Sequence, residues 1–139
     1  MWAAAENHAG AVRALVDAGA DVNARSAALN YRQMKFATDA MITTPFPRGS
    51  WTALMYAARD GALDGARALA DAGADLNLTD RDGTTALVFA IINGHFDVAA
   101  MLLNQGADPN VADSTGMAAL YATVDMHTLE TILSLPRNG

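Results

Sequence analysis

The chain has 139 residues, a net charge of −6 and no cysteine, and 52% of its residues are hydrophobic. This length suits a single domain, and the absence of cysteine excludes disulfides and thiolate metal sites. The negative charge argues against nucleic acid as a partner. No apolar run approaches the roughly 18 residues that span a bilayer, so we expect no membrane partner either.

One short phrase occurs three times along the chain. It reads GADVN at residues 19–23, GADLN at 73–77 and GADPN at 106–110. The second and third copies start 33 residues apart, whereas the first and second start 54 residues apart. A period of this length is typical of stacked repeats, and the wider gap indicates 21 additional residues (54 − 33) after the first copy.

The first unit, residues 1–25, enters the repeat partway, because Met1 aligns with Met55 of the second unit. We therefore expect a shortened helix, then a second helix that ends near Gly19. Trp2 and the alanines after it give this end an apolar surface, whereas terminal repeats normally have a polar outer face. We interpret the chain as part of a longer array and expect frayed ends or end-to-end self-association.

Residues 26–48 form an insertion between the first and second units. The segment is basic within an acidic chain and contains aromatic residues such as Tyr31 and Phe36. Loops of this length are usually functional or disordered, and the apolar content favours partial order, with the segment folded over the inner face. Two interpretations carry equal weight: a loop that covers the stack, or a binding arm of basic and aromatic character.

The remaining units are residues 49–81, 82–114 and 115–139, and each reads as a turn followed by two helices. In the third unit Thr85 is placed to cap a helix that runs from Ala86 to about Asn93. Gly94 ends that helix by supplying a left-handed conformation. A second helix is expected from Phe96 to about Asn104, with apolar residues at helical spacing on one face.

This 33-residue unit, with T-x-L near its start and G-A-D-x-N near its end, resembles an ankyrin repeat. The family motif T-P-L-H reads TALM from Thr52, TALV from Thr85 and AALY from Ala118, so its proline and histidine are absent. The resemblance implies an all-α solenoid of about four helix pairs. In overall character the sequence is similar to bacterial ankyrin-repeat proteins that have no assigned role.

The resemblance also implies a concave groove formed by the turns and the first helices, and it places Trp51, Tyr56, Phe89 and Ile92 there as exposed side chains. Exposed aromatic residues favour a binding interface. We therefore predict a scaffold that binds a protein or peptide through the groove and the insertion. The predicted binding residues are Tyr31, Phe36, Trp51, Tyr56, Arg59, Phe89 and Ile92.

No catalytic, metal or cofactor motif is recognisable. The sequence DRDG, residues 80–83, resembles part of a calcium loop but lacks its remaining ligands, and a tight turn explains it. His95 follows Gly94, where the resemblance implies a ring that bonds the neighbouring turn. The aspartates and asparagines of the G-A-D-x-N phrase recur in successive units, so we expect them to tie adjacent repeats.

Two other functions stay open at this point. One is a small-molecule or hydrolytic site formed where the insertion closes over the groove. Its residues would be Arg32, Lys35, Asp39, Arg59 and Asp60. The other is a purely architectural spacer within a longer solenoid, for which changes at Tyr56 and Phe89 would leave partner binding unchanged.

Overall fold

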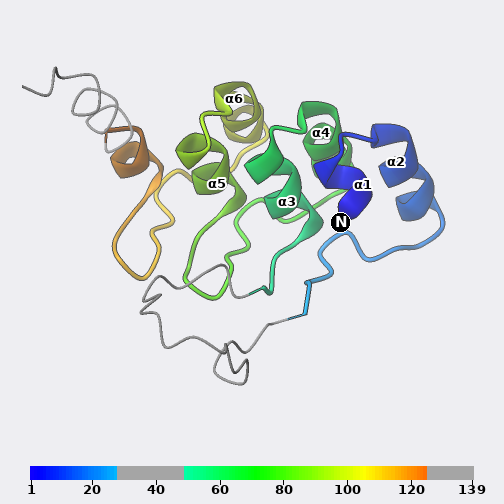
Figure 1. Cartoon of the computed structure of the whole chain (residues 1–139), viewed down its shortest axis with the longest axis horizontal. Helices are drawn as coiled ribbons and strands as arrows, with labels where there is room; N and C mark the ends of the chain where they lie inside the picture. Colours follow the sequence, from blue (N-terminus) through cyan, green and yellow to red (C-terminus); the bar gives the residue numbers. More distant parts are fainter. Residues whose placement is uncertain (28–48, 125–139) are drawn as a thin grey trace, which may run out of the picture.

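The computed structural model describes residues 1–27 and 49–124, and in this part the chain forms helical hairpins set in a row (Figure 1). The helices are α1 (Trp2–Ala5), α2 (Ala9–Asp17), α3 (Ala53–Asp60), α4 (Leu63–Asp71), α5 (Ala86–Ile92) and α6 (Phe96–Asn104). A further helix begins at residue 119 and is described as far as residue 124. Within the described ranges, no helix has the length and apolarity that crossing a membrane requires.

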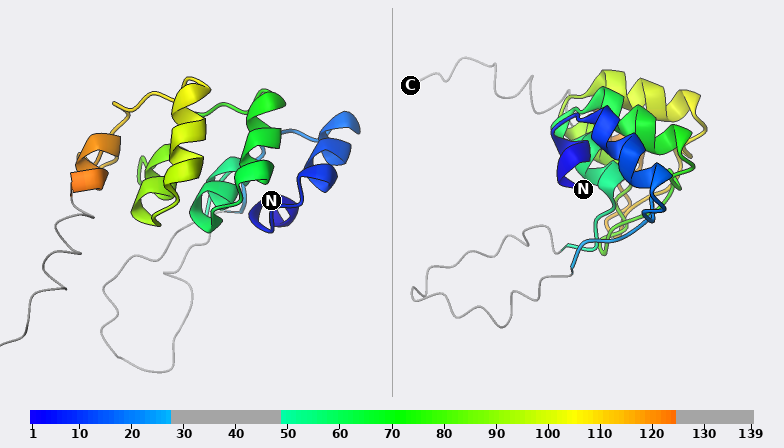
Figure 2. Two further views of the ribbon diagram at one scale, coloured as in Figure 1. Left: turned by 90° about the horizontal axis from the view of Figure 1, so that it is seen from above. Right: turned by 90° about the vertical axis from the view of Figure 1, so that its right-hand side faces the viewer.

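The helices lie in two layers (Figure 2). The first helix of each hairpin packs beside its counterparts, α1 against α3 and α3 against α5, and the second helices α2, α4 and α6 do the same. The connections between hairpins project together from one side of the layers (Figure 1). This is the predicted solenoid, in which each hairpin buries its apolar flank only against its neighbours.

The predicted ends of the third hairpin are confirmed. The hydroxyl of Thr85 accepts a hydrogen bond of 3.3 Å from the backbone N–H of Val88, so Thr85 caps α5 at its first residue. Gly94 has a φ of 76° and turns the chain from α5 into α6. Thr52 caps α3 through the equivalent bond to Met55.

The core lies between the two layers and consists of alanines interspersed with larger apolar residues. Alanine side chains allow the helices to approach closely and are good helix formers. The largest fully buried apolar side chains are Leu54, Met55, Leu87, Val88, Val98 and Leu102. Burying each of the larger ones contributes roughly 1.5–3 kcal/mol, so stability accumulates along the row of repeats.

The connections after the second and third repeats share one hydrogen-bonding pattern. The backbone N–H of Asp80 donates to the carbonyl of Thr84 at 3.0 Å, and the Asp80 carboxylate accepts from the N–H of Thr84 at 2.9 Å. Asp113 and Met117 repeat both bonds at 3.1 Å and 2.9 Å. Each aspartate therefore closes a tight turn over three residues, as the DRDG sequence predicts.

Ser26 and Trp51 close the longer connection in the same way. The N–H of Ser26 donates to the carbonyl of Trp51 at 2.8 Å, and the Ser26 hydroxyl accepts from the N–H of Trp51 at 3.0 Å. Residues 27–50 therefore correspond to residues 81–83 of the next connection. The two connections have 24 and three residues, so their lengths differ by 21 residues (24 − 3). The expectation that the insertion folds over the inner face concerns residues 28–48, outside the described part.

Arg25 reinforces this closure. Its Nη1 donates to the carbonyls of Ser50, at 2.9 Å, and Thr79, at 2.7 Å. Ser50 has a φ of 66°, a conformation that non-glycine residues seldom adopt. The guanidinium therefore ties the return of the long connection to the next repeat and helps to hold Ser50 in its left-handed conformation.

Candidate functional site

The structure describes five of the predicted binding residues, Trp51, Tyr56, Arg59, Phe89 and Ile92. Tyr31 and Phe36 lie in residues 28–48 and so outside the described part. Four of the five come together: Trp51 just before α3, Tyr56 and Arg59 on α3, and Phe89 on α5. We call Trp51, Tyr56, Arg59 and Phe89 the Trp51 cluster.

Trp51 is the centre of this cluster. Its ring centroid lies 4.5 Å from that of Phe89 and 5.1 Å from that of Tyr56, both in tilted arrangements that aromatic pairs favour. Trp51 is only 3% exposed and Phe89 only 8% exposed. The prediction that these two side chains are exposed is therefore wrong, because the two rings pack on each other across the boundary between repeats.

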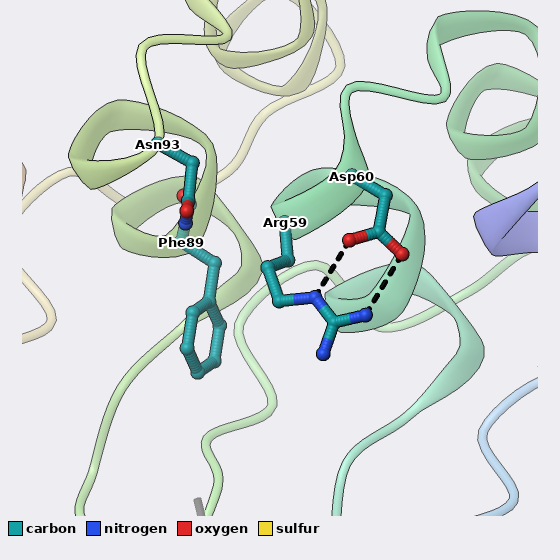
Figure 3. Close-up of polar contacts among 4 residues, drawn as sticks. All are labelled: Arg59, Asp60, Phe89 and Asn93. Atoms are coloured by element: carbon teal, nitrogen blue, oxygen red, sulfur yellow. Dashed lines mark hydrogen bonds and ion pairs between the residues drawn. The ribbon is translucent and has the colours of Figure 1, made fainter.

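Arg59 covers the rings from the α3 side. Its guanidinium carbon lies 5.2 Å from the Trp51 ring centroid and 5.3 Å from that of Tyr56, within the range of a cation–π contact. Nε and Nη2 donate to the two carboxylate oxygens of Asp60 at 2.7 and 2.9 Å (Figure 3). This bidentate pair fixes the plane of the guanidinium over the rings.

The charge of Arg59 is secured by the same contacts. The hydrogen bond to Asp60 raises the pKa of Arg59 above its ordinary value, partial burial opposes this, and the negative charge of Asp60 adds to the rise. The side chain of Arg59 is 38% exposed. The cluster therefore has a permanently charged guanidinium, partly neutralised by Asp60, above the buried rings of Trp51 and Phe89.

Asp80 is a member of the site that sequence reasoning missed. Its Oδ1 accepts the turn bond from Thr84, while its Oδ2 accepts a hydrogen bond of 3.3 Å from the indole Nε1 of Trp51. The sequence showed Asp80 only as a turn former. Because Trp51 lies 29 residues earlier, the second role depends on how the end of the second unit folds back onto its start.

Tyr56 and Ile92 keep part of their surface accessible, since both are half-buried at the edge of the core. Ile92 is the last residue of α5. The side-chain amide of the next residue, Asn93, donates to the carbonyl of Phe89 at 2.8 Å and so holds the end of the helix (Figure 3). The accessible part of the site thus combines an aromatic edge, an aliphatic side chain and a guanidinium.

The repeat assignment also rests on a comparison with known families. A family model described as ankyrin repeats, in three copies, matches residues 1–113. The chain belongs to the ankyrin repeat family. No curated protein matches the sequence significantly. Ankyrin repeats generally serve as scaffolds for protein–protein interaction and are typically not enzymatic.

Of the side chains proposed for a small-molecule site, the part of this ankyrin stack that the structure describes contains only Arg59 and Asp60. Arg59 and Asp60 bind each other, and Arg32, Lys35 and Asp39 lie in residues 28–48. Within residues 1–27 and 49–124, no group of three or more histidine or carboxylate side chains is arranged to hold a metal ion.

His95 has a packing role between two ankyrin repeats. A Cβ added to Gly61 would lie 2.5 Å from Nδ1 of the His95 ring, so the ring fits against the bare glycine of the preceding repeat. The ring therefore contacts the neighbouring turn by close packing, and the bond that the resemblance implied is not among the hydrogen bonds of the described residues. This arrangement explains why a small residue occupies position 61, where φ is also positive, at 72°.

Proposed function

We propose that this ankyrin stack binds a protein or peptide on the face where the turns meet α3 and α5, with the Trp51 cluster at the centre of the contact. The observation that carries the proposal is the position of Arg59. Its guanidinium is held by two hydrogen bonds and two ring contacts while its side chain stays partly exposed. A side chain fixed in this way loses little entropy when a partner binds it.

The buried members of the cluster act indirectly in this proposal. Trp51 and Phe89 form the floor that supports the surface, and they do not themselves reach the partner. Tyr56, Arg59 and Ile92 make the contact. Aromatic residues and arginine are enriched at binding hot spots, and a rigid support beneath them reduces the cost of ordering an interface.

The proposal is tested by comparing two charge reversals of equal size. Arg59→Glu places a negative charge on the proposed contact surface, whereas Arg67→Glu places it on α4, in the other layer, at an exposed position. Partners captured from a lysate of the source cells are quantified for the parent chain and both variants. A partner that is lost with Arg59→Glu and kept with Arg67→Glu supports the proposal, and equal retention by both variants contradicts it.

The insertion is the second part of the proposed surface. The measurement is the same capture with a variant that lacks residues 28–46. Loss of the partner on deletion assigns a contact to the insertion. Identical captured sets remove the insertion from the proposal and leave the Trp51 cluster as the contact.

A further inference from the structure

The guanidinium of Arg59 has hydrogen-bond donors that the described residues do not use. An arginine carries five N–H groups, and the Asp60 carboxylate accepts one from Nε and one from Nη2. Figure 3 shows Nη1 on the side of the guanidinium that points away from Asp60. Within residues 1–27 and 49–124 Nη1 makes no hydrogen bond, so three N–H groups of Arg59 (5 − 2) can be donated to a partner.

The carboxylates around this guanidinium are already engaged. Both oxygens of Asp60 accept from Arg59. In Asp80, Oδ1 accepts two backbone N–H groups of its own turn at 2.9 Å, and Oδ2 accepts from the indole of Trp51. Two negative charges therefore lie around one positive charge, and they would repel a carboxylate of the partner. A neutral acceptor, such as a backbone carbonyl, fits the donors of Arg59 better.

Two half-buried side chains provide apolar contact surface beside these donors. Tyr56 lies one helical turn before Arg59 on α3, and its ring centroid is 5.3 Å from the guanidinium carbon. Ile92 on α5 is the equivalent of Arg59 one repeat later (92 − 59 = 33). The helices α3 and α5 pack side by side, and the axes of packed helices lie roughly 8–10 Å apart. A segment that crosses both helices therefore meets apolar side chains at about this spacing.

A polyproline II segment matches both the spacing and the donors. It has three residues per turn and rises about 3.1 Å per residue, so positions i and i+3 lie about 9 Å apart on one side. Its carbonyls make no internal hydrogen bonds, and proline has no N–H that would need an acceptor from this surface. Because the conformation is formed before binding, little entropy is lost when it docks.

We infer that the segment bound at the Trp51 cluster is a proline-rich stretch in the polyproline II conformation. Two prolines three residues apart pack on Tyr56 and Ile92, and a carbonyl of the segment accepts a hydrogen bond from Nη1 of Arg59. This inference rests on the proposed function, since it names the kind of peptide that the same surface binds.

The test is a selection from a phage-displayed library of random twelve-residue peptides on the parent chain. Enriched peptides are synthesised, and their affinities are measured by fluorescence anisotropy for the parent, Arg59→Met and Arg67→Met. Arg59→Met removes the donors and keeps an unbranched side chain over the rings. Arg67→Met makes the same change at an exposed position on α4, in the other layer.

The inference expects enriched peptides that share the pattern Pro-x-x-Pro. They should bind Arg59→Met roughly tenfold more weakly than the parent, because a hydrogen bond from a charged group is lost, and should bind Arg67→Met unchanged. Peptides that need Arg59 but are acidic or helical and lack paired prolines overturn the inference and leave the proposed function standing. No enrichment, or peptides that bind Arg59→Met as tightly as the parent, contradicts the proposed function and this inference with it.

Double-mutant cycles then place the two prolines. Each proline of an enriched peptide is replaced by alanine, and binding is measured for the parent, Tyr56→Ala and Ile92→Ala, with circular dichroism to verify that each chain is folded. Each replacement should weaken binding less, by roughly twofold or more, in the variant that lacks its contact. Replacements that weaken binding equally in all three chains overturn the placement of the prolines on this surface.

Discussion

The side-chain oxygen of Asn77 accepts a hydrogen bond of 2.8 Å from the backbone N–H of Asp108, which lies 31 residues later in the sequence. Asn23 and Asp75 make the same bond at 2.9 Å one repeat earlier. Asp75 in turn accepts from the N–H of Asn77 at 3.0 Å. The G-A-D-x-N phrase therefore forms a polar ladder from one repeat to the next, which confirms the predicted tie between adjacent repeats.

The first prediction concerns one rung of this ladder. Asn77→Ala should lower the free energy of unfolding by about 1 kcal/mol, the typical net value of one hydrogen bond. Urea unfolding followed by circular dichroism measures the loss. The matched control is Asn110→Ala, since the bonds described for Asn110 go to Asp108 within its own loop. If both variants lose the same stability, the contact between repeats contributes nothing beyond a local turn.

The second prediction concerns the long connection. Replacing residues 27–50 by Arg-Asp-Gly, the sequence of residues 81–83, should leave the ankyrin stack folded, because Ser26 and Trp51 already form the base of a tight turn. Shortening the loop from 24 to three residues should raise the free energy of unfolding by up to about 2 kcal/mol through the lower cost of loop closure. Thermal and urea unfolding measure the change.

A control for this replacement is Ser26→Ala in the full chain, which removes the hydroxyl that accepts from Trp51. This substitution should lower the free energy of unfolding by about 1 kcal/mol, and unfolding should remain cooperative. Loss of cooperative unfolding in the shortened chain would show instead that residues 27–50 are a structural part of the stack.

Much of the fold could be predicted because the residues that begin and end the helices of each repeat can be recognised in the sequence. The cap at Thr85, the turn at Gly94 and the helix from Phe96 to Asn104 each depend on residues a few positions apart. Such local signals are readable without knowing how distant segments pack.

The site was predicted less well because its contacts cross between repeats. Position in the repeat placed Trp51 and Phe89 on the inner face but did not show that their rings meet, since they lie 38 residues apart (89 − 51). Nor did it show that Arg59 would cover them. Side-chain direction at these positions is set by the particular neighbours, and a single sequence does not reveal those neighbours.

The third prediction tests the burial of Trp51 by fluorescence. The chain has two tryptophans, and Trp2 is 71% exposed whereas Trp51 is 3% exposed. In Trp2→Phe the remaining emission should be shifted to shorter wavelength and quenched weakly by acrylamide. In Trp51→Phe the emission of Trp2 should be shifted to longer wavelength and quenched strongly. Equal quenching constants in the two variants would contradict the packing of Trp51 on Phe89.

The fourth prediction concerns Asp113. Burial alone raises its pKa, but hydrogen bonds from the Thr115 hydroxyl and from the backbone of Met117, Thr115 and Gly116 outweigh burial, so the pKa lies below its ordinary value of 3.8. A carboxyl with a lowered folded-state pKa contributes stability above its unfolded-state pKa, and that stability is lost as pH falls through the folded-state value. Asp113→Asn should therefore destabilise the chain at pH 7, with a difference from the parent that shrinks in acid.

Urea unfolding of both proteins between pH 7 and pH 2 measures this difference. The parent chain at each pH serves as the reference, so general acid destabilisation cancels. A difference between Asp113→Asn and the parent that does not change with pH would mean that the charge of Asp113 is irrelevant to the turn.

The fifth prediction separates two reasons for the glycine at position 61. Gly61 and Gly94 have similar positive φ values of 72° and 76°, so an alanine at either position should cost roughly 1–2 kcal/mol for the left-handed backbone. Apart from its two chain neighbours, an alanine Cβ at position 94 would meet no atom within 4 Å, whereas one at position 61 would lie 2.5 Å from the His95 ring. Gly61→Ala should therefore lose clearly more stability than Gly94→Ala when both are unfolded in urea.

The additional loss of stability in Gly61→Ala can be attributed to His95 only if removing the His95 ring reduces that loss. In a double-mutant cycle, His95→Ala should cost less in the Gly61→Ala background than in the parent, because the ring then obstructs the new methyl group. The same cycle with Gly73→Ala should be additive, since an alanine Cβ at position 73 would meet no atom within 4 Å and position 73 is not adjacent to His95 in the chain. Additivity in both cycles would mean that the backbone conformation alone requires Gly61, and that His95 does not hold the second and third repeats together there.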